Sequence, residues 1–63
     1  MKTNETLHIE MLNKSGIWIK VESGILNTSI MISKALDRAK KRYPDARVRA
    51  VGAITQTVYD MIS

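Results

Sequence analysis

The chain has 63 residues, no cysteine and a single histidine, which excludes disulfides, thiolate metal sites and a histidine-based metal site within one chain. A chain of this length buries only about 60% of the surface that its unfolded form exposes, so self-association is the remaining way to add stability. Ten Lys and Arg against six Asp and Glu give a net charge of +4, which favours acidic or phosphorylated partners.

No apolar run approaches the roughly 20 residues of a membrane span. The opening stretch MKTNETLHIE also has no hydrophobic signal core. We therefore expect one small domain over residues 1–63 that acts in the cytoplasm without a membrane partner, with its polar residues 1–5 frayed.

The first half of the chain predicts a β-hairpin, with strands at residues 6–12 and 17–23 and a turn at Gly16, which can take a positive φ. The first strand has one apolar parity, as a half-buried strand requires: Leu7, Ile9 and Met11. The second strand alternates more cleanly and presents two faces: Ile17, Ile19 and Val21 on one, and Trp18, Lys20 and Glu22 on the other.

Residues 27–43 predict the one helix. Its start is marked by Asn27, Thr28 and Ser29, whose side-chain oxygens can accept from the first backbone N–H groups, and Pro44 ends it. Apolar side chains recur at three- and four-residue spacing and form a single stripe that needs a surface to cover: Ile32, Ala35, Leu36, Ala39 and Tyr43.

Two further strands are predicted at residues 47–51 and 57–62. In the first, Val48 and Ala50 alternate with Arg47, Arg49 and Val51. The second can be oriented in two ways, with either Val58 and Ile62 or Tyr59 and Met61 toward the helix. Asp60 shares a face with the first pair, which favours the second orientation.

The order strand, strand, helix, strand, strand predicts an α+β domain of ββαββ order, in which one helix covers one face of a four-stranded antiparallel sheet. The uncovered face would display His8, Glu10, Leu12, Trp18, Lys20, Glu22, Arg47, Arg49 and Val51. Because exposed apolar side chains such as Trp18 usually mark an interface, we expect a homo-oligomer, a dimer or higher.

The uncovered face is also the first candidate binding site. Trp18 could stack on a base while Lys20, Arg47 and Arg49 neutralise phosphate. The alternative interpretation is that Trp18 anchors an oligomer interface and that the arginines pair with Glu10 and Glu22 across the sheet.

A second candidate is the start of the helix, where Asn27, Thr28 and Ser29 could hold an anion together with the helix dipole. Helix capping explains the same residues. A third is the basic helix end at Arg38, Lys40, Lys41 and Arg42, which could contact nucleic-acid phosphates or be a solvated surface.

The composition gives little support to catalysis. His8 is the only imidazole, no cysteine nucleophile exists, and no two carboxylates have the spacing of a paired acid and base. We expect no enzyme, no catalytic residue, no metal and no cofactor.

One stretch of the chain, from Trp18 to Val51, carries the pattern W-x-K-V-x-S-G-x-x-x-T-S-x-M-I-x-x-A-L-x-x-A-K-x-x-Y-P-D-x-R-V-R-A-V. It resembles short phage-encoded accessory proteins over about half the chain. The resemblance implies stoichiometric action in the host cytoplasm, either by binding a host protein or by sequestering a signalling nucleotide made by a defence system.

The function expected from the sequence is therefore a non-enzymatic, phage-type accessory protein that oligomerises and sequesters an anionic, nucleotide-like molecule. The expected ligand-binding residues are Trp18, Lys20, Arg47, Arg49, Asn27, Thr28 and Ser29. A nucleic-acid-binding module and an inhibitor of a host protein remain as alternatives.

Overall fold

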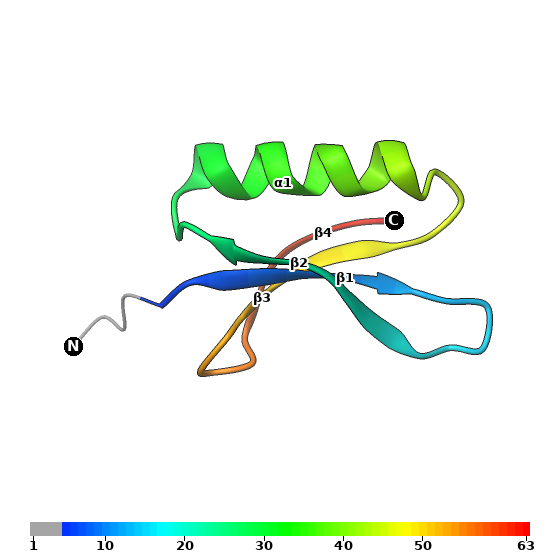
Figure 1. The fold of residues 1–63 in the computed structure, drawn as a ribbon, viewed down its shortest axis with the longest axis horizontal. Coiled ribbons are helices and arrows are strands. Elements are labelled where there is room, and N and C mark those ends of the chain that lie inside the picture. The colour runs from blue at the N-terminus through cyan, green and yellow to red at the C-terminus, as the bar shows by residue number, and fades with distance from the viewer. Residues whose placement is uncertain (1–4) are drawn as a thin grey trace.

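The computed structural model describes residues 5–63 and confirms the predicted ββαββ architecture (Figure 1). The elements are β1 (Leu7–Leu12), β2 (Trp18–Ile25), α1 (Ser29–Arg42), β3 (Val48–Gly52) and β4 (Val58–Ile62). The strands form one antiparallel sheet in the order β2-β1-β3-β4. Helix α1 lies along one face of this sheet (Figure 1).

Helix α1 begins and ends where its capping groups dictate. Thr28 is the N-cap, and its Oγ1 accepts a hydrogen bond of 3.2 Å from the N–H of Met31. At the other end the N–H of Tyr43 donates to the carbonyl of Ala39 at 2.9 Å. The helix is therefore two residues shorter at its start and one shorter at its end than predicted.

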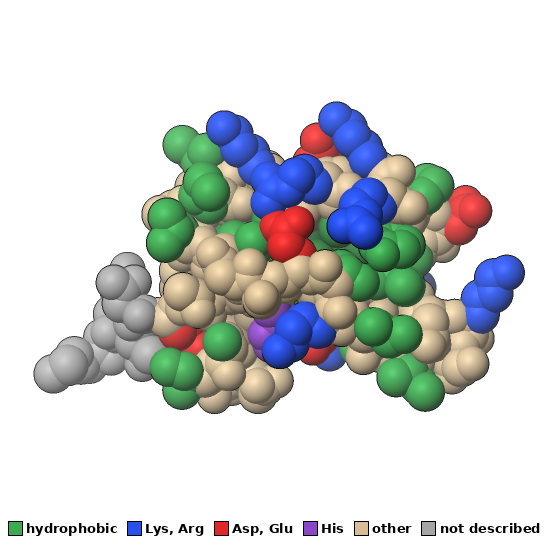
Figure 2. Space-filling model, in the orientation of Figure 1, with side chains coloured by type: hydrophobic (Ala, Val, Ile, Leu, Met, Phe, Trp, Pro, Cys, Tyr) green, Lys and Arg blue, Asp and Glu red, His purple; other side chains and the backbone are tan. Residues whose placement is uncertain are grey.

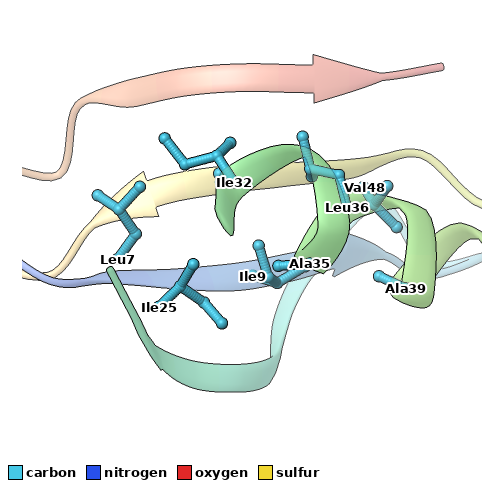
Figure 3. Close-up of a cluster of buried hydrophobic side chains, with 9 residues drawn as sticks. Leu7, Ile9, Ile25, Ile32, Ala35, Leu36, Ala39 and Val48 are labelled. Atoms are coloured by element: carbon cyan, nitrogen blue, oxygen red, sulfur yellow. The ribbon is translucent and has the colours of Figure 1, made fainter. Parts of the chain in front are cut away.

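The hydrophobic core lies between α1 and the sheet (Figure 3). The predicted helix stripe supplies four buried residues, Ile32, Ala35, Leu36 and Ala39. The predicted parities of β1 and β3 hold, since the side chains that face these helix residues are Leu7, Ile9, Val48 and Ala50, each fully buried. Ile25 closes the core from β2.

Strand β2 departs from the predicted alternation because two irregularities interrupt its pairing with β1. Glu10 pairs with Lys20, but Ile9 pairs with Glu22, so Val21 is an extra residue on β2. The bulge turns Glu22 to the helix side, where its carboxylate accepts from Arg38 at 2.6 Å. The prediction that Glu22 shares a face with Trp18 and Lys20 is wrong for this reason.

Strand β4 contains a similar irregularity opposite the step from Ala50 to Val51. Ile62 pairs with Val48 and packs against the core, whereas Met61 pairs with Arg49 on the other face. Neither predicted orientation of β4 holds along the whole strand, because the extra residue, Tyr59, breaks the alternation. The favoured orientation is wrong for Met61, which is 48% exposed.

Candidate ligand-binding face

The sheet face opposite α1, which we call the open face, gathers side chains from all four strands. The pairing registers place there Trp18 and Lys20 of β2, His8, Glu10 and Leu12 of β1, Arg49 and Val51 of β3, and Val58 and Met61 of β4. Lys20, Glu10, Arg49 and Met61 form one row across the sheet. The open face therefore brings together three of the predicted ligand-binding residues: Trp18, Lys20 and Arg49.

Arg49 is the centre of this face. Its guanidinium carbon lies 3.9 Å from the centre of the Trp18 ring, the geometry of a cation–π contact. Its Nε donates to Glu10 Oε1 at 2.7 Å. The other carboxylate oxygen of Glu10 accepts from His8 Nε2 at 3.0 Å. Strand β1 thus supplies a carboxylate that fixes the arginine over the tryptophan of β2.

The hydrogen bonds from Arg49 and His8 favour the ionised form of Glu10. Partial burial acts against ionisation, but the hydrogen bonds from Arg49 and His8 outweigh it and lower the pKa of Glu10. The ionised carboxylate balances Arg49, and Lys20 beside it makes no ion pair with any residue of the segment 5–63. The polar part of the open face therefore has an excess of positive charge.

The apolar part of the open face differs from the predicted patch. Val51 is only 2% exposed and His8 only 6%, so neither adds to the exposed surface of this face. Leu12 and Trp18 are half-buried. The strongly exposed apolar side chains are instead Val58 and Met61, which the predicted orientations of β4 did not place together on this face.

Arg47 precedes β3 and lies at the end of the open face. The N–H of Leu12 donates to its carbonyl at 2.9 Å, which places Arg47 across from Leu12, itself the partner of Trp18. Its side chain is exposed and borders a groove at this end of the molecule. Arg47 is therefore a neighbour of the cluster of Trp18, Glu10 and Arg49, outside the hydrogen bonds that organise it.

The start of α1 does not join the open face. Asn27 and Thr28 precede the helix and Ser29 is its first residue, and the helix covers the opposite side of the sheet (Figure 1). The hydroxyl of Thr28 caps the helix through Met31. The sheet therefore separates these three residues from the predicted ligand-binding residues of the open face.

The basic end of α1 is largely engaged within the chain. Arg38 pairs with Glu22, Lys41 pairs with Asp37 at 3.2 Å, and Lys40 Nζ donates to the carbonyl of Ala46 at 2.7 Å. The guanidinium of Arg42 lies 5.6 Å from the ring centre of Tyr43. Figure 2 shows basic side chains spread over the helix with acidic ones between them. This interleaving favours a solvated surface over a nucleic-acid contact.

The most strongly perturbed carboxylate is Glu5, which sequence reasoning assigned to a frayed segment. Glu5 is 3% exposed and accepts from the N–H groups of Ile54 and Thr55 at 2.9 and 3.0 Å. The hydroxyls of Thr55 and Tyr59 donate to it at 2.6 and 2.7 Å. The prediction of a frayed segment is therefore wrong for Glu5, and its other residues, 1–4, lie outside the described residues.

These donors explain the acidity of Glu5. The hydrogen bond from the Thr55 hydroxyl contributes most, followed by the Thr55 N–H and Tyr59, and together they lower the pKa of Glu5 from 4.5 to about 2. The same contact raises the pKa of Tyr59, whose proton is held by the carboxylate. All four donors come from the turn and strand after β3, so Glu5 fastens the start of the chain to its end.

Gly52 makes room for this carboxylate. A Cβ at position 52 would lie 2.6 Å from the Cδ and both carboxylate oxygens of Glu5, closer than side-chain atoms pack. A side chain at position 52 would therefore displace the Glu5 carboxylate from its hydrogen bonds. No signal in local alternation or turn chemistry reveals this contact, because the partners are about fifty residues apart in the sequence.

Within the described chain no group of three or more His, Cys, Asp or Glu side chains is placed to hold a metal ion. No helix of residues 5–63 is long and apolar enough to cross a membrane. Comparison of the chain with protein-family models, with curated proteins and with solved structures gives no match. Functional inference therefore rests on the geometry of the open face.

Proposed function

We propose that this protein is a non-enzymatic binding protein of the phage accessory type, which self-associates and sequesters an anionic, nucleotide-like molecule on its open face. The observation that carries the proposal is the stacking of Arg49 on Trp18. Among residues 5–63 the side-chain hydrogen bonds of Arg49 involve only Nε. The two terminal nitrogens of the Arg49 guanidinium can therefore donate hydrogen bonds to a ligand.

The arrangement favours a ligand that is both planar and anionic. A guanidinium that is already fixed by stacking and by one carboxylate loses little conformational freedom when it binds a phosphate. This small loss favours a strong charge-assisted pair. Lys20 lies beside Glu10 in the same row and adds a second cation. A base can stack on the exposed part of the Trp18 and Arg49 planes.

The burial and the hydrogen bond of His8, the only histidine of the sequence, support a non-catalytic role. His8 is buried and its Nε2 is committed to Glu10, so it is poorly placed to exchange protons with a substrate. The cluster has the composition of a recognition surface, with an aromatic ring and cations around one structural carboxylate.

One observation favours a second candidate, the inhibition of a host protein through the open face. Val58 and Met61 are 44% and 48% exposed on this face and lie on the edge strand β4. Exposed apolar side chains beside a stacked Trp and Arg are typical of the centre of a protein interface. The same two residues could instead close the proposed homo-oligomer.

The first experiment uses Trp18 as an intrinsic probe, since it is the only tryptophan. Its fluorescence is titrated with a panel of mono-, di- and cyclic nucleotides, and native mass spectrometry is recorded on protein purified from cells. We expect quenching by a subset of nucleotides, or an added mass of a few hundred daltons that denaturation removes. Binding should weaken in Arg49→Gln and be retained in the matched control Arg42→Gln on the helix.

The outcomes separate the candidates. Unchanged Trp18 fluorescence with every nucleotide, together with no added mass, would overturn sequestration. Recovery of one host protein at stoichiometric yield, lost in Met61→Glu, would then favour the inhibitor. Binding to nucleic acid that is lost on neutralising Lys40, Lys41 and Arg42, and that falls steeply with salt, would favour the nucleic-acid alternative.

A further inference from the structure

A groove lies at the end of the molecule where the β1–β2 turn faces the connection from α1 to β3. Its volume is about 500 Å³, which is within the range of small-molecule sites. Strand β1 and helix α1 end here, and β2 and β3 begin here, so the groove is formed by two loops and the end of β1. It is separate from the stacked pair of Trp18 and Arg49.

Both walls of the groove are fixed by hydrogen bonds. On the turn side, Asn13 Oδ1 accepts from the N–H groups of Ser15 and Ile17, each at 2.9 Å. On the other side, Lys40 Nζ donates to the carbonyl of Ala46. The N–H of Ala46 donates to the carbonyl of Tyr43 at 3.1 Å. The groove is therefore present before any ligand binds, which lowers the cost of ordering it.

The two walls are also joined to each other. The N–H of Leu12, at the end of β1, donates to the carbonyl of Arg47 at 2.9 Å. The main chains of the two walls can therefore separate only if this hydrogen bond of the sheet breaks.

The lining is mostly apolar and carries more cations than anions. Five of the nine lining residues are apolar, among them Met11, Leu12, Tyr43 and Pro44. The charged lining residues are Lys14 and Arg47 against Asp45, so the lining carries one net positive charge. Apolar lining with few polar groups is the usual composition of a small-molecule site.

We propose that this groove binds a small molecule with an apolar body and one acidic group, held by Met11, Leu12, Tyr43 and Pro44 along its body and by Lys14 and Arg47 at its acid. Contact with the apolar lining side chains removes apolar surface of both partners from water. The excess of cations selects an acid over an amine. Leu12 and Arg47 also border the open face, but Trp18, Lys20 and Arg49 do not line the groove.

The test uses 8-anilinonaphthalene-1-sulfonate, an apolar aromatic sulfonate whose fluorescence rises in apolar surroundings, and decanoate as a competing carboxylate. Binding is mapped by amide shift changes in ¹H–¹⁵N spectra of the folded protein. We expect shift changes centred on residues 11–14 and 43–47, and displacement of the dye by decanoate.

Two variants test the two parts of the site. Ala46→Phe places a ring in the groove without removing a main-chain hydrogen bond and should abolish dye binding. Arg47→Glu should weaken binding about tenfold, as expected for loss of one charge-assisted contact. Lys34→Glu makes the same charge change at an exposed helix position and should leave binding unchanged.

The opposite results would overturn the proposal. They are unchanged binding in Ala46→Phe, equal weakening by Lys34→Glu and Arg47→Glu, or shift changes centred on the exposed apolar residues of β4. Spectra of each variant report whether it is folded. Arg49→Gln, which tests the nucleotide-binding face, should leave dye binding intact, so failure of one proposal is distinguishable from failure of the other.

Discussion

The side chain of Arg49 on β3 reaches across β1 and places its guanidinium carbon 3.9 Å from the centre of the Trp18 ring on β2. Between them Glu10 holds Arg49 Nε at 2.7 Å. Three strands are thus joined on the open face by one polar and one cation–π contact. The same contacts that hold the sheet together also orient the cation that the proposed function uses.

Replacing Arg49 should affect stability as well as binding. Arg49→Gln removes the cation–π contact and leaves the half-buried carboxylate of Glu10 with only His8 as a donor, so we expect a loss of about 1–3 kcal/mol. Urea unfolding followed by circular dichroism measures it. Glu10→Gln/Arg49→Gln should lose less than the sum of the single variants, and additive losses would show that the pair does not interact.

Acidification should destabilise the protein through Glu5. Its pKa falls from 4.5 to about 2 on folding, so the folded protein binds fewer protons than the unfolded chain between these values. The stabilisation is complete above pH 4.5 and is lost as the pH falls toward 2. Urea midpoints measured across this range should fall with pH in the natural protein.

The variant Glu5→Gln isolates this effect from that of Glu10, whose pKa is also lowered. The pH dependence between about 4.5 and 2 should be clearly flatter in Glu5→Gln than in the natural protein. Asp45→Asn, at an exposed position, is the matched control and should retain the full slope. An unaltered slope in Glu5→Gln would count against the buried carboxylate contact.

Gly52→Ala should be destabilising because its Cβ would lie 2.6 Å from the Glu5 carboxylate. We expect a loss of about 1–3 kcal/mol, as for other overpacked positions. In a Glu5→Ala background the same substitution should be nearly neutral, since the clashing group is gone. Thermal unfolding of the four proteins of this cycle measures the coupling, and its absence would contradict the packing of Glu5 on Gly52.

Self-association through the open face should depend on Met61, which is 48% exposed there. Met61→Glu should shift the mass measured by light scattering after gel filtration from oligomer to monomer. Ile30→Glu is the control, because Ile30 is 66% exposed on α1. A monomeric natural protein, or dissociation only in Ile30→Glu, would contradict an interface on this face.

The sequence by itself determined the element order, the helix and the buried faces of β1 and β3. The helix follows from its three- and four-residue apolar spacing. The buried faces of β1 and β3 follow from uninterrupted alternation, which puts Leu7 and Ile9 on one face of β1 and Val48 and Ala50 on one face of β3. Predicting the common face of Trp18, Lys20 and Arg49 required only that the strands pair within one sheet. The common face of these three residues could therefore be predicted from local alternation.

Only the tertiary structure decided the remaining features. The bulges at Val21 and Tyr59 each shift the alternation by one residue, which moves Glu22 to the helix side and Met61 to the open face. Local composition does not mark the bulges at Val21 and Tyr59, because each extra residue there is specified by packing on both strands. The helix start was separated from Trp18 because the sheet lies between them.

Glu5 shows the same limit most clearly. Its four donors lie on residues 54, 55 and 59, about fifty positions away, and its neighbours in sequence are polar. From its local sequence, a carboxylate in such a segment is expected to be solvated. Only the folded structure shows that residues 54, 55 and 59 lie beside it. Alternation along the chain determines which face is buried, whereas contacts between distant segments determine which polar groups are buried with it, because only those contacts can replace the water that such groups lose.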